Sequence, residues 1–322
     1  MSAIDLKIRA LPVGAEVMDL DAERQKDPGV RAALYQAWLK HGILLFRNVD
    51  SIERHLDLSR CFGELEIHPF PAVRSELNPL LIEIGGRKRA RAFVFDGDQL
   101  RINRVGWHRD TAYTPDICKG AMLRMVEVPQ HEGETLFADT ARAYDDLPAD
   151  MKARLDGLEY KGTLRLDPVD QTRPGAFWTT ARPASDAEDP DGPPLDAFRS
   201  GGQANYPPVV HPVVLVHPES GRRCLFISPT YVDHFLGMDP AESDALHRYL
   251  ADHLAQPRYV YQHRWKPNEA IVWDNRRFLH AARGNLLSEP RWGLRTTLAG
   301  ALRTGRYFDE SGDRRIPPRI AD

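Results

Sequence analysis

The chain has 322 residues, enough for one large domain or two ordinary ones, and its 42% hydrophobic and 28% charged residues are typical of a globular protein with a sizeable core. The formal net charge of −3 at pH 7 gives no electrostatic reason to expect nucleic acid or an anionic membrane as a partner. No run of about 18 apolar residues occurs, so we expect no transmembrane helix, and the first residues lack the order of a signal peptide.

The three cysteines, Cys61, Cys118 and Cys224, are odd in number and far apart in the chain. This spacing fits neither a disulfide framework nor a Cys-X-X-Cys zinc site, and it favours buried, reduced thiols. These features lead us to expect a cytoplasmic protein of enzyme size.

Two helices are predicted in the N-terminal part of the chain. Residues 30–40 carry apolar side chains at helical spacing, and Gly42 stands where a C-terminal cap belongs. Ser51 is the expected N-cap of a second helix that Gly63 ends. The apolar run 43–46 between them predicts a buried strand.

The middle of the chain is poor in helix signals. Short strands are predicted at 80–84, 91–95 and 122–128, and two short helices between residues 140 and 158. Residues 166–208 differ in kind, because they contain Pro- and Gly-rich stretches and little periodicity. Loops of this length inside a compact domain are usually functional lids or disordered segments. We therefore expect residues 166–208 to form an active-site lid that orders on substrate binding, and a tolerated surface insertion is the alternative that the sequence leaves open.

The C-terminal part returns to strands and one helix. The expected elements are a hairpin at 209–227, a helix at 239–254 with Asp239 as N-cap, and strands at 259–265, 270–273 and 292–299. There is no βαβ alternation, internal repeat or clean linker, so we predict one catalytic domain over residues 1–322. The predicted fold class is mainly β with flanking helices, built on a double-stranded β-helix, or jelly-roll, barrel.

A metal site is suggested by Trp107-His108-Arg109-Asp110 together with the distant His280. Residues two apart in a strand point to the same face, so the side chains of His108 and Asp110 should lie together. Two histidines and one carboxylate form the facial triad of non-haem Fe(II) oxygenases. His-X-Asp alone is weak evidence, because a chain with 12 histidines and 46 acidic residues contains one easily by chance. We interpret Arg109 as a solvated surface charge.

Arg291 and Arg295 stand four apart in a predicted strand, which places both guanidinium groups on one face. Buried cations need anionic partners, because an unpaired buried charge is energetically expensive. A dicarboxylate co-substrate and an anionic primary substrate would supply them. An edge strand with solvated arginines is the alternative that the sequence leaves open.

Together these motifs resemble the taurine dioxygenase family, which includes the chlorophenoxyacetate dioxygenases. The likeness covers nearly the whole chain, and the order and spacing of the matching blocks are highly specific. The blocks are Phe62-Gly63-Glu64-Leu65 with His68-Pro69, Trp107-His108-Arg109-Asp110, Gly133-Glu134-Thr135-Leu136, His211-Pro212-Val213-Val214 with His217-Pro218-Glu219-Ser220-Gly221, Trp273-Asp274-Asn275-Arg276, His280, Arg291 and Arg295.

The resemblance implies an enzyme that uses Fe(II), α-ketoglutarate and O₂. It implies that His108, Asp110 and His280 hold the iron, and that Arg291 binds the distal carboxylate of α-ketoglutarate with help from the Thr135 hydroxyl. The chemistry of the residues agrees, since Arg offers a rigid fork to a carboxylate where Lys offers a point charge. Halogenases of this type lack the carboxylate ligand, so the presence of Asp110 argues against halogenation.

The resemblance also indicates substrate-binding residues. Arg295 and His68 match positions that contact the sulfonate and line the pocket in the taurine enzyme, and Arg104 stands where that enzyme has an amide side chain. We therefore expect Arg295, His68 and Arg104 to bind the substrate. Phe70-Pro71 replaces a stretch that supplies an aromatic hydroxyl, and the 166–208 loop is longer than usual. These departures predict a substrate that differs from taurine and is larger.

The predicted function is hydroxylation of an aliphatic C–H bond in a small anionic substrate, a carboxylate, sulfonate or sulfate, coupled to decarboxylation of α-ketoglutarate to succinate and CO₂. Desaturation, oxidative cleavage and biosynthetic tailoring are alternatives on the same iron centre. A zinc hydrolase with the same three ligands and a non-catalytic sensor of the same fold are alternatives from other classes. We expect no nucleic-acid or membrane partner, and relatives suggest a homodimer or homotetramer.

Overall fold

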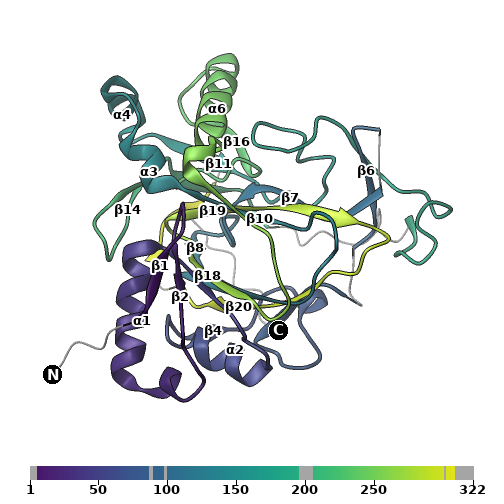
Figure 1. The fold of residues 1–322 in the computed structure, drawn as a ribbon. Coiled ribbons are helices and arrows are strands. Elements are labelled where there is room, and N and C mark those ends of the chain that lie inside the picture. Colours follow the sequence, from purple (N-terminus) through teal and green to yellow (C-terminus); the bar gives the residue numbers. More distant parts are fainter. Residues whose placement is uncertain (1–5, 87–89, 98–99, 196–205, 301, 309–322) are drawn as a thin grey trace.

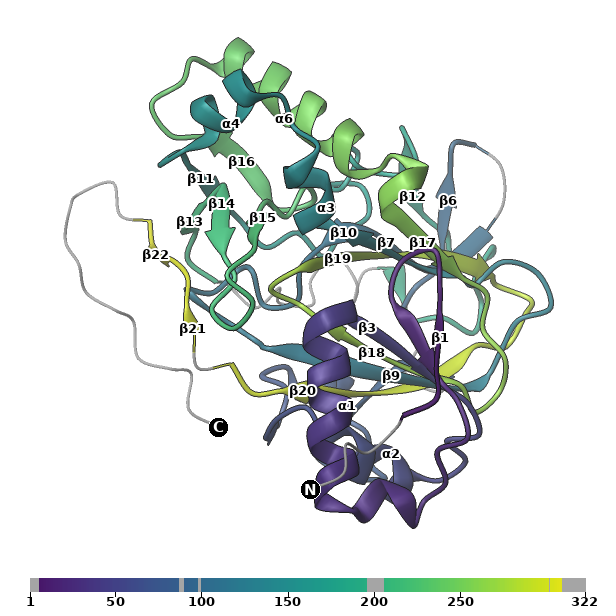
Figure 2. The ribbon, with the colours of Figure 1, turned by 60° about the vertical axis from the view of Figure 1, so that its left-hand side comes forward.

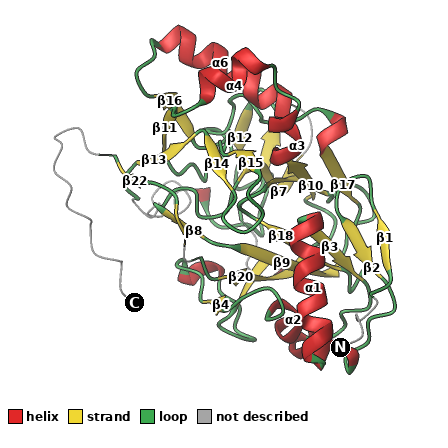
Figure 3. Ribbon diagram, turned by 90° about the vertical axis from the view of Figure 1, so that its left-hand side faces the viewer, coloured by secondary structure: helices red, strands yellow, loops and turns green. Residues whose placement is uncertain are grey.

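The computed structural model describes residues 6–86, 90–97, 100–195, 206–300 and 302–308, and Figure 1 shows their arrangement. Helices flank the strands on two sides. Figure 3 shows α3, α4 and α6 on one side of the sheets and α1 and α2 on the other. The α-helices are α1 (Pro28–His41), α2 (Ile52–Ser59), α3 (Thr140–Asp145), α4 (Ala149–Leu155) and α6 (Pro240–Leu254), and the short 3₁₀ helices are η1 (Arg24–Lys26), η2 (Pro71–Val73) and η4 (Pro257–Tyr259).

The helices begin and end largely where the sequence supplies caps. The predicted cap at Gly42 is confirmed, because this residue ends α1 with a φ of 73°, in the left-handed region. Ser51 accepts a hydrogen bond from the backbone of Arg54 and begins α2, as predicted, although α2 already ends at Ser59. Asp239 begins α6 by accepting hydrogen bonds from two backbone N–H groups.

Two large sheets make up most of the molecule. The eight-stranded sheet contains, in order, β1 (Ile8–Ala10), β2 (Ala15–Val17), β3 (Ile43–Phe46), β18 (Ala270–Asp274), β9 (Gly120–Glu127), β20 (Trp292–Leu298) and β4 (Leu65–Glu66), with β5 (Leu81–Gly85) also paired to β20. The six-stranded sheet contains, in order, β12 (Ala181–Pro183), β6 (Phe93–Phe95), β7 (Leu100–His108), β19 (Phe278–Leu286), β10 (Thr135–Asp139) and β17 (Val260–His263).

Three smaller sheets complete the strands. Four strands pair in the order β16 (Val232–Phe235), β11 (Glu159–Gly162), β13 (Val209–Pro212) and β22 (Arg306–Tyr307). The predicted hairpin is confirmed as β14 (Val214–Val216) paired with β15 (Arg223–Leu225), and β21 (Leu302–Arg303) pairs with β8 (Asp116–Ile117).

The two large sheets face each other across an apolar core, and Figure 2 shows β10 and β19 above β18 and β9. Leu123 of β9, Ile271 and Trp273 of β18 and Phe137 of β10 belong to the same buried cluster. The mainly β architecture with flanking helices is as predicted. Among the described residues, strand pairing joins neighbours within each large sheet and does not link one large sheet to the other.

The long segment 166–208, predicted as a loop, contains a strand. Its residues Ala181–Pro183 form β12, which pairs antiparallel with β6 at the edge of the six-stranded sheet. Residues 196–205 of this segment lie outside the described ranges. Where the structure describes the chain, none of its helices combines the length and the apolar composition of a transmembrane segment. All three cysteines are buried and unpaired, as predicted.

His55 of α2 gives the fold a sensitivity to acid. Its ring is fully buried against the carbonyl oxygen of Met122, and burial lowers its pKa from 6.5 to about 3. The unfolded chain therefore binds a proton that the folded chain does not, so the stability contributed by neutral His55 is present above pH 6.5 and is lost as the pH falls toward 3.

We expect the free energy of unfolding to fall by about 2 kcal/mol between pH 7.5 and 5.0 because of this one group, with a slope that approaches about 1.4 kcal/mol per pH unit below pH 6.5. Urea unfolding at pH 7.5 and 5.0 measures it. In the variant His55→Leu, which lacks the titrating ring, the difference between the two pH values should shrink by that amount. An equal difference in both proteins would contradict the assignment.

Candidate metal centre

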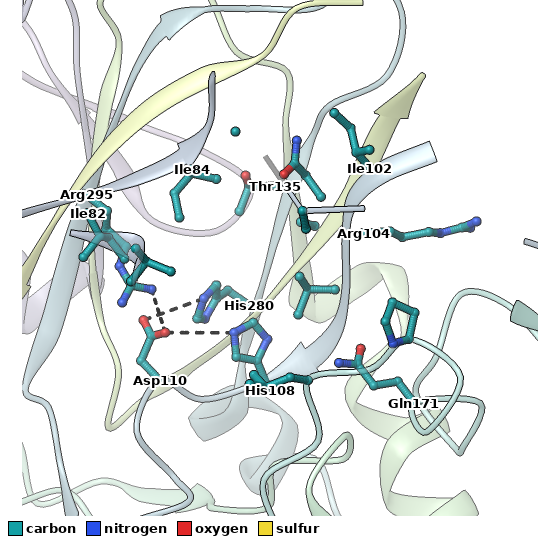
Figure 4. A pocket seen from close by; sticks show the side chains of 18 of the residues that line it. Ile82, Ile84, Ile102, Arg104, His108, Asp110, Thr135, Gln171, His280 and Arg295 are labelled. Carbon is teal, nitrogen blue, oxygen red and sulfur yellow. Dashed lines mark hydrogen bonds and ion pairs between the residues drawn. The ribbon is translucent and has the colours of Figure 1, made fainter. Parts of the chain in front are cut away.

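The structure brings together the three side chains predicted to bind metal. His108 is the last residue of β7, and it lies directly opposite His280 in the antiparallel pair of β7 and β19. Asp110 follows two residues after the end of β7, in a turn, so the predicted strand alternation does not position it. The turn nevertheless places the Asp110 carboxylate next to the imidazoles of His108 and His280 (Figure 4).

The geometry of this cluster fits one metal ion. Nε2 of His108 and Nε2 of His280 lie 4.0 and 3.7 Å from the two Asp110 carboxylate oxygens, and the imidazole centroids are 4.2 Å apart. Potential ligand atoms of the three side chains all lie within 4.8 Å of one another. Among the described residues, this is the one set of at least three His, Cys, Asp or Glu side chains whose potential ligand atoms lie this close together.

The protonation states also fit a metal. Burial lowers the pKa of His108 and lowers that of His280 well below 6.5, so both imidazoles are neutral at neutral pH. Burial alone would raise the pKa of Asp110, but the charge and hydrogen bond of the Arg295 guanidinium lower it and keep the carboxylate ionised. Nδ1 of His108 lies 2.9 Å from the Gly106 carbonyl oxygen. A proton on that nitrogen leaves Nε2 free to coordinate.

The donor set itself is the one expected for non-haem iron. Two neutral imidazoles and one carboxylate leave the other positions of an octahedral Fe(II) open. Oδ2 of Asp110 and Nδ1 of His280 are buried and lack a hydrogen-bond partner among the described residues. A bound cation would compensate the otherwise unsatisfied carboxylate oxygen.

Asn275 holds the turn that carries Asp110. Its side-chain oxygen accepts a hydrogen bond from the Asp110 backbone N–H at 3.0 Å, and its amide nitrogen donates to the Asp110 carbonyl at 2.9 Å. Asn275 follows β18 directly and precedes His280 by five residues. The two distant sequence motifs are therefore joined through the backbone of the metal-ligand turn.

Arg109 was interpreted as a solvated surface charge, and this interpretation is wrong. Its side chain is fully buried, packs over the Phe226 ring with 4.7 Å between the guanidinium carbon and the ring centroid, and donates to the Leu225 and Asn275 carbonyls. The Arg109 side chain therefore bonds the turn to β15 and to the residues after β18.

Arg291 and Thr135 line the same cavity as the metal ligands. Arg291, immediately before β20, is 4% exposed, and its Nε and Nη1 groups have no hydrogen-bond partner among the described residues. Burial lowers its pKa to about 10, so the guanidinium stays charged at neutral pH. A buried cation of this kind needs an anion that binds from outside the fold. The carboxylate of a co-substrate fits this requirement.

The Thr135 hydroxyl has a partner that sequence analysis did not identify. Nε1 of Trp265, two residues beyond β17, donates to Oγ1 of Thr135 at 2.9 Å. Both side chains are buried.

Arg295 and His68 lie beside the metal ligands, but Arg295 is already paired. Its Nη1 donates to Oδ1 of Asp110 at 2.7 Å, and its Nε has no described partner (Figure 4). Burial lowers the pKa of Arg295, but Asp110 outweighs this effect and raises it. Burial and the nearby Arg295 lower the pKa of His68 to about 4, so His68 is neutral at neutral pH. An ion pair with a metal ligand was not predicted for Arg295.

Arg104 has a different orientation from the other predicted substrate residues. Figure 4 shows its side chain directed away from His108 and Asp110. Its guanidinium packs over the Phe95 and Trp178 rings, at 4.9 and 5.1 Å from their centroids, and donates to the Phe177 carbonyl. Arg104 therefore joins β7 to the segment that precedes β12, although it also lines the cavity.

A cavity of about 420 Å³ opens in front of the cluster, and its walls away from the metal ligands are largely apolar and aromatic. Tyr113 and Tyr231 line it close to Asp110, and the Phe70 ring stacks on Tyr113 with centroids 5.9 Å apart. Neither tyrosine had a sequence signal, because both lie outside the recognised motifs. Further lining residues include Ile82, Ile84, Phe93, Phe95, Ile102, Leu123, Leu166, Pro168 and Gln171, and also the polar Glu83, Arg91, Arg101, Asn103 and Arg165.

Comparisons with known proteins agree with this geometry. The family described as Taurine catabolism dioxygenase TauD, TfdA family matches residues 7–297. An (S)-phenoxypropionate/alpha-ketoglutarate-dioxygenase from Sphingobium herbicidovorans is 31% identical over 301 residues, which is 93% of this chain and 94% of that protein. An alpha-ketoglutarate-dependent sulfate ester dioxygenase from Pseudomonas putida is 27% identical over 91% of this chain and 88% of that protein. The crystal structure of a taurine dioxygenase from Burkholderia xenovorans is similar with a TM-score of 0.70 at 26% identity, covering 96% of both chains.

Proposed function

We propose, from the premise that the chain belongs to the taurine catabolism dioxygenase TauD, TfdA family, that it hydroxylates an aliphatic C–H bond of a small organic anion with an apolar body. The chain is an enzyme, an Fe(II)- and α-ketoglutarate-dependent dioxygenase. When bound, iron and α-ketoglutarate activate O₂, and α-ketoglutarate is converted to succinate and CO₂. We further propose that the two large sheets form a jelly-roll scaffold.

In this proposal His108, Asp110 and His280 hold Fe(II), and Arg291 with Thr135 holds the distal carboxylate of α-ketoglutarate. One observation supports this proposal more strongly than the others. A buried, uncompensated guanidinium lies in the same cavity as two neutral imidazoles and an ionised carboxylate. A metal site alone would suit a zinc hydrolase equally well, but the unpartnered guanidinium beside it supports a carboxylate co-substrate that binds together with the metal.

The primary substrate is proposed to present its carboxylate, sulfonate or sulfate to Arg295 and His68. Arg295 donates to Asp110 through Nη1, so the other N–H groups of its guanidinium remain for a second anion. The apolar and aromatic side chains that line the cavity, among them Phe70, Tyr113 and Tyr231, favour a bulky hydrocarbon or aromatic body over a small polar one. The relatives named for phenoxypropionate and for sulfate esters act on substrates of this chemistry.

We also propose that the described start of segment 166–208 forms part of the substrate pocket. Its residues Leu166, Pro168 and Gln171 line the cavity, and Gln171 accepts a hydrogen bond from the backbone N–H of Gly106, two residues before His108. This contact supports the lid interpretation over that of a surface insertion.

The proposed function is tested by succinate release with Fe(II), α-ketoglutarate and O₂, using aryloxyalkanoates, alkyl sulfates and sulfonates alongside their neutral amide or ester analogues. We expect release with at least one anion class and little with its neutral analogue. Arg295→Ala should raise the KM for that anion about 10- to 100-fold, as expected for one lost charge-assisted contact of about 1.5–3 kcal/mol, and change the KM for α-ketoglutarate far less.

A matched control is Arg248→Ala, because Arg248 is exposed on α6 and does not line the cavity. Fe(II) affinity is measured for both variants, since Arg295 also contacts a metal ligand. Equal turnover of anions and neutral analogues would refute the anion anchor. A wild-type enzyme that hydrolyses esters with zinc and releases no succinate would refute the dioxygenase reaction.

A further inference from the structure

The hydrogen bond between Trp265 and Thr135 constrains the direction of one proton. An indole N–H can only donate, so Oγ1 of Thr135 must act as the acceptor in this 2.9 Å contact. A threonine hydroxyl also carries one proton of its own to donate. Among the described residues no acceptor for that proton is found, although Thr135 is only 3% exposed. The open space that Thr135 faces is the cavity.

Arg291 shares this part of the cavity. A Cβ atom added at Gly133, two residues before Thr135, would lie 3.8 Å from Cδ of Arg291, so the arginine side chain passes the start of β10. The unpartnered Nε and Nη1 groups of Arg291 and the free proton of Thr135 are therefore donors that lack acceptors in one region. A carboxylate placed there would accept from both residues.

We infer that Trp265 is a positioning residue for α-ketoglutarate binding. By occupying one acceptor site of Thr135 Oγ1, its indole N–H turns the hydroxyl proton toward the co-substrate's distal carboxylate. Without this bond the hydroxyl can rotate and present a lone pair, which would repel the carboxylate. The inference rests on the proposed function in one respect, since it takes α-ketoglutarate as the ligand of Arg291 and Thr135.

The indole is itself held in place by a buried polar network. The Trp265 ring packs edge-on against His263, with centroids 4.5 Å apart and an interplanar angle of 86°. His263 lies directly opposite Thr135 in the pairing of β10 with β17. The His263 ring contacts Glu269 through Nε2 at 3.0 Å and the Tyr261 hydroxyl through Nδ1 at 2.8 Å. Trp265 therefore has a fixed orientation rather than an adjustable one.

Other buried tryptophans show that this bond is not a general requirement of the fold. The indole nitrogens of Trp38, Trp273 and Trp292 are buried and have no hydrogen-bond partner among the described residues. Trp38 lies in the core between α1 and the eight-stranded sheet, in a different cluster from Trp265. It provides a matched control for loss of an indole.

The test is calorimetric titration of the Mn(II)-loaded protein with α-ketoglutarate and, separately, with oxalate, which chelates a metal but lacks the distal carboxylate. The proteins are wild type, Trp265→Phe, Thr135→Val, the double variant, Trp38→Phe and Arg291→Ala. We expect Trp265→Phe and Thr135→Val each to raise the Kd for α-ketoglutarate about 5- to 10-fold. The double variant should bind no more weakly than Thr135→Val, because the indole acts only through the hydroxyl. Trp38→Phe should bind as wild type.

Oxalate affinity should be the same in all of these proteins, and kcat at saturating α-ketoglutarate should be unchanged in Trp265→Phe. A wild-type Kd in Trp265→Phe, or effects of the two single variants that multiply in the double variant, would overturn the inference while leaving the clamp intact. A wild-type Kd in Arg291→Ala would overturn the clamp itself and the inference with it. Should Trp265→Phe fail to fold, Trp265→Leu, whose side chain has no N–H donor, completes the same cycle.

Discussion

Asp110→Ala is expected to eliminate detectable succinate release and to weaken Fe(II) or Mn(II) binding by more than about 100-fold. The reason is that Asp110 supplies the only carboxylate of the metal cluster, and even the loss of a group that merely supports a metal ligand costs 10- to 100-fold in affinity. Metal titration of the apoprotein and succinate release measure the two effects. Asp116→Ala, at an exposed position six residues further on, is the matched control and should behave as wild type.

The same variant has a second expected effect, on stability. Removing Asp110 leaves the buried guanidinium of Arg295 without its 2.7 Å partner, and breaking one side of a buried ion pair costs about 3–5 kcal/mol. Adding Arg295→Met to Asp110→Ala removes the unpaired charge and should recover part of this loss in urea unfolding. Retained hydroxylation by Asp110→Ala would refute the triad, and equal stability of the single and double variants would refute the pairing.

Arg291→Met is expected to raise the KM for α-ketoglutarate by about 100-fold or more, because the proposed clamp would lose two charge-assisted hydrogen bonds of about 1.5–3 kcal/mol each. The same substitution should leave the apoprotein at least as stable as wild type. In wild type the buried guanidinium is uncompensated when the co-substrate is absent, and replacing such a charge by an apolar side chain of similar size removes a desolvation penalty.

Thermal unfolding with and without α-ketoglutarate distinguishes these effects. A ligand that binds only the folded state raises its stability, so the co-substrate should raise the Tm of Mn(II)-loaded wild type and leave that of Arg291→Met nearly unchanged. Arg291→Lys keeps the charge but loses the planar guanidinium. The rise in Tm that α-ketoglutarate causes in this variant should lie between those of wild type and Arg291→Met. A destabilised Arg291→Met apoprotein would show that the guanidinium has an internal partner and does not await a ligand.

The fold was predictable where local chemistry decides it. Caps at Gly42, Ser51 and Asp239 mark helix ends through hydrogen bonds within a few residues, so a single sequence contains the signal. The strand Ala181–Pro183 was missed, because three residues show no periodicity and its partner β6 lies far away in sequence. Long-range pairing of a short edge strand is decided by the tertiary structure.

The candidate site was predictable to a similar degree. The types and spacing of His108, Asp110, His280 and Arg291 suggested a metal and a carboxylate clamp, and the structure places all four around one cavity. The partners of these residues were not predictable. Side-chain direction in the turn after β7 does not follow strand alternation, so neither the burial of Arg109 nor the contact between Arg295 and Asp110 could be read from spacing.

The two hydrogen bonds between the Asn275 side chain and the backbone of Asp110 affect how the apoprotein binds a metal ion. They connect the Asp110 turn to the turn that leads into β19, so the backbone positions of Asp110 and His280 are fixed relative to each other in the folded chain. The conformational entropy of assembling the ligands is then lost during folding and not during metal capture. Metal should therefore bind to a preformed cage, quickly and without a change in backbone order, and Asn275 is the residue that makes the cage rigid beforehand.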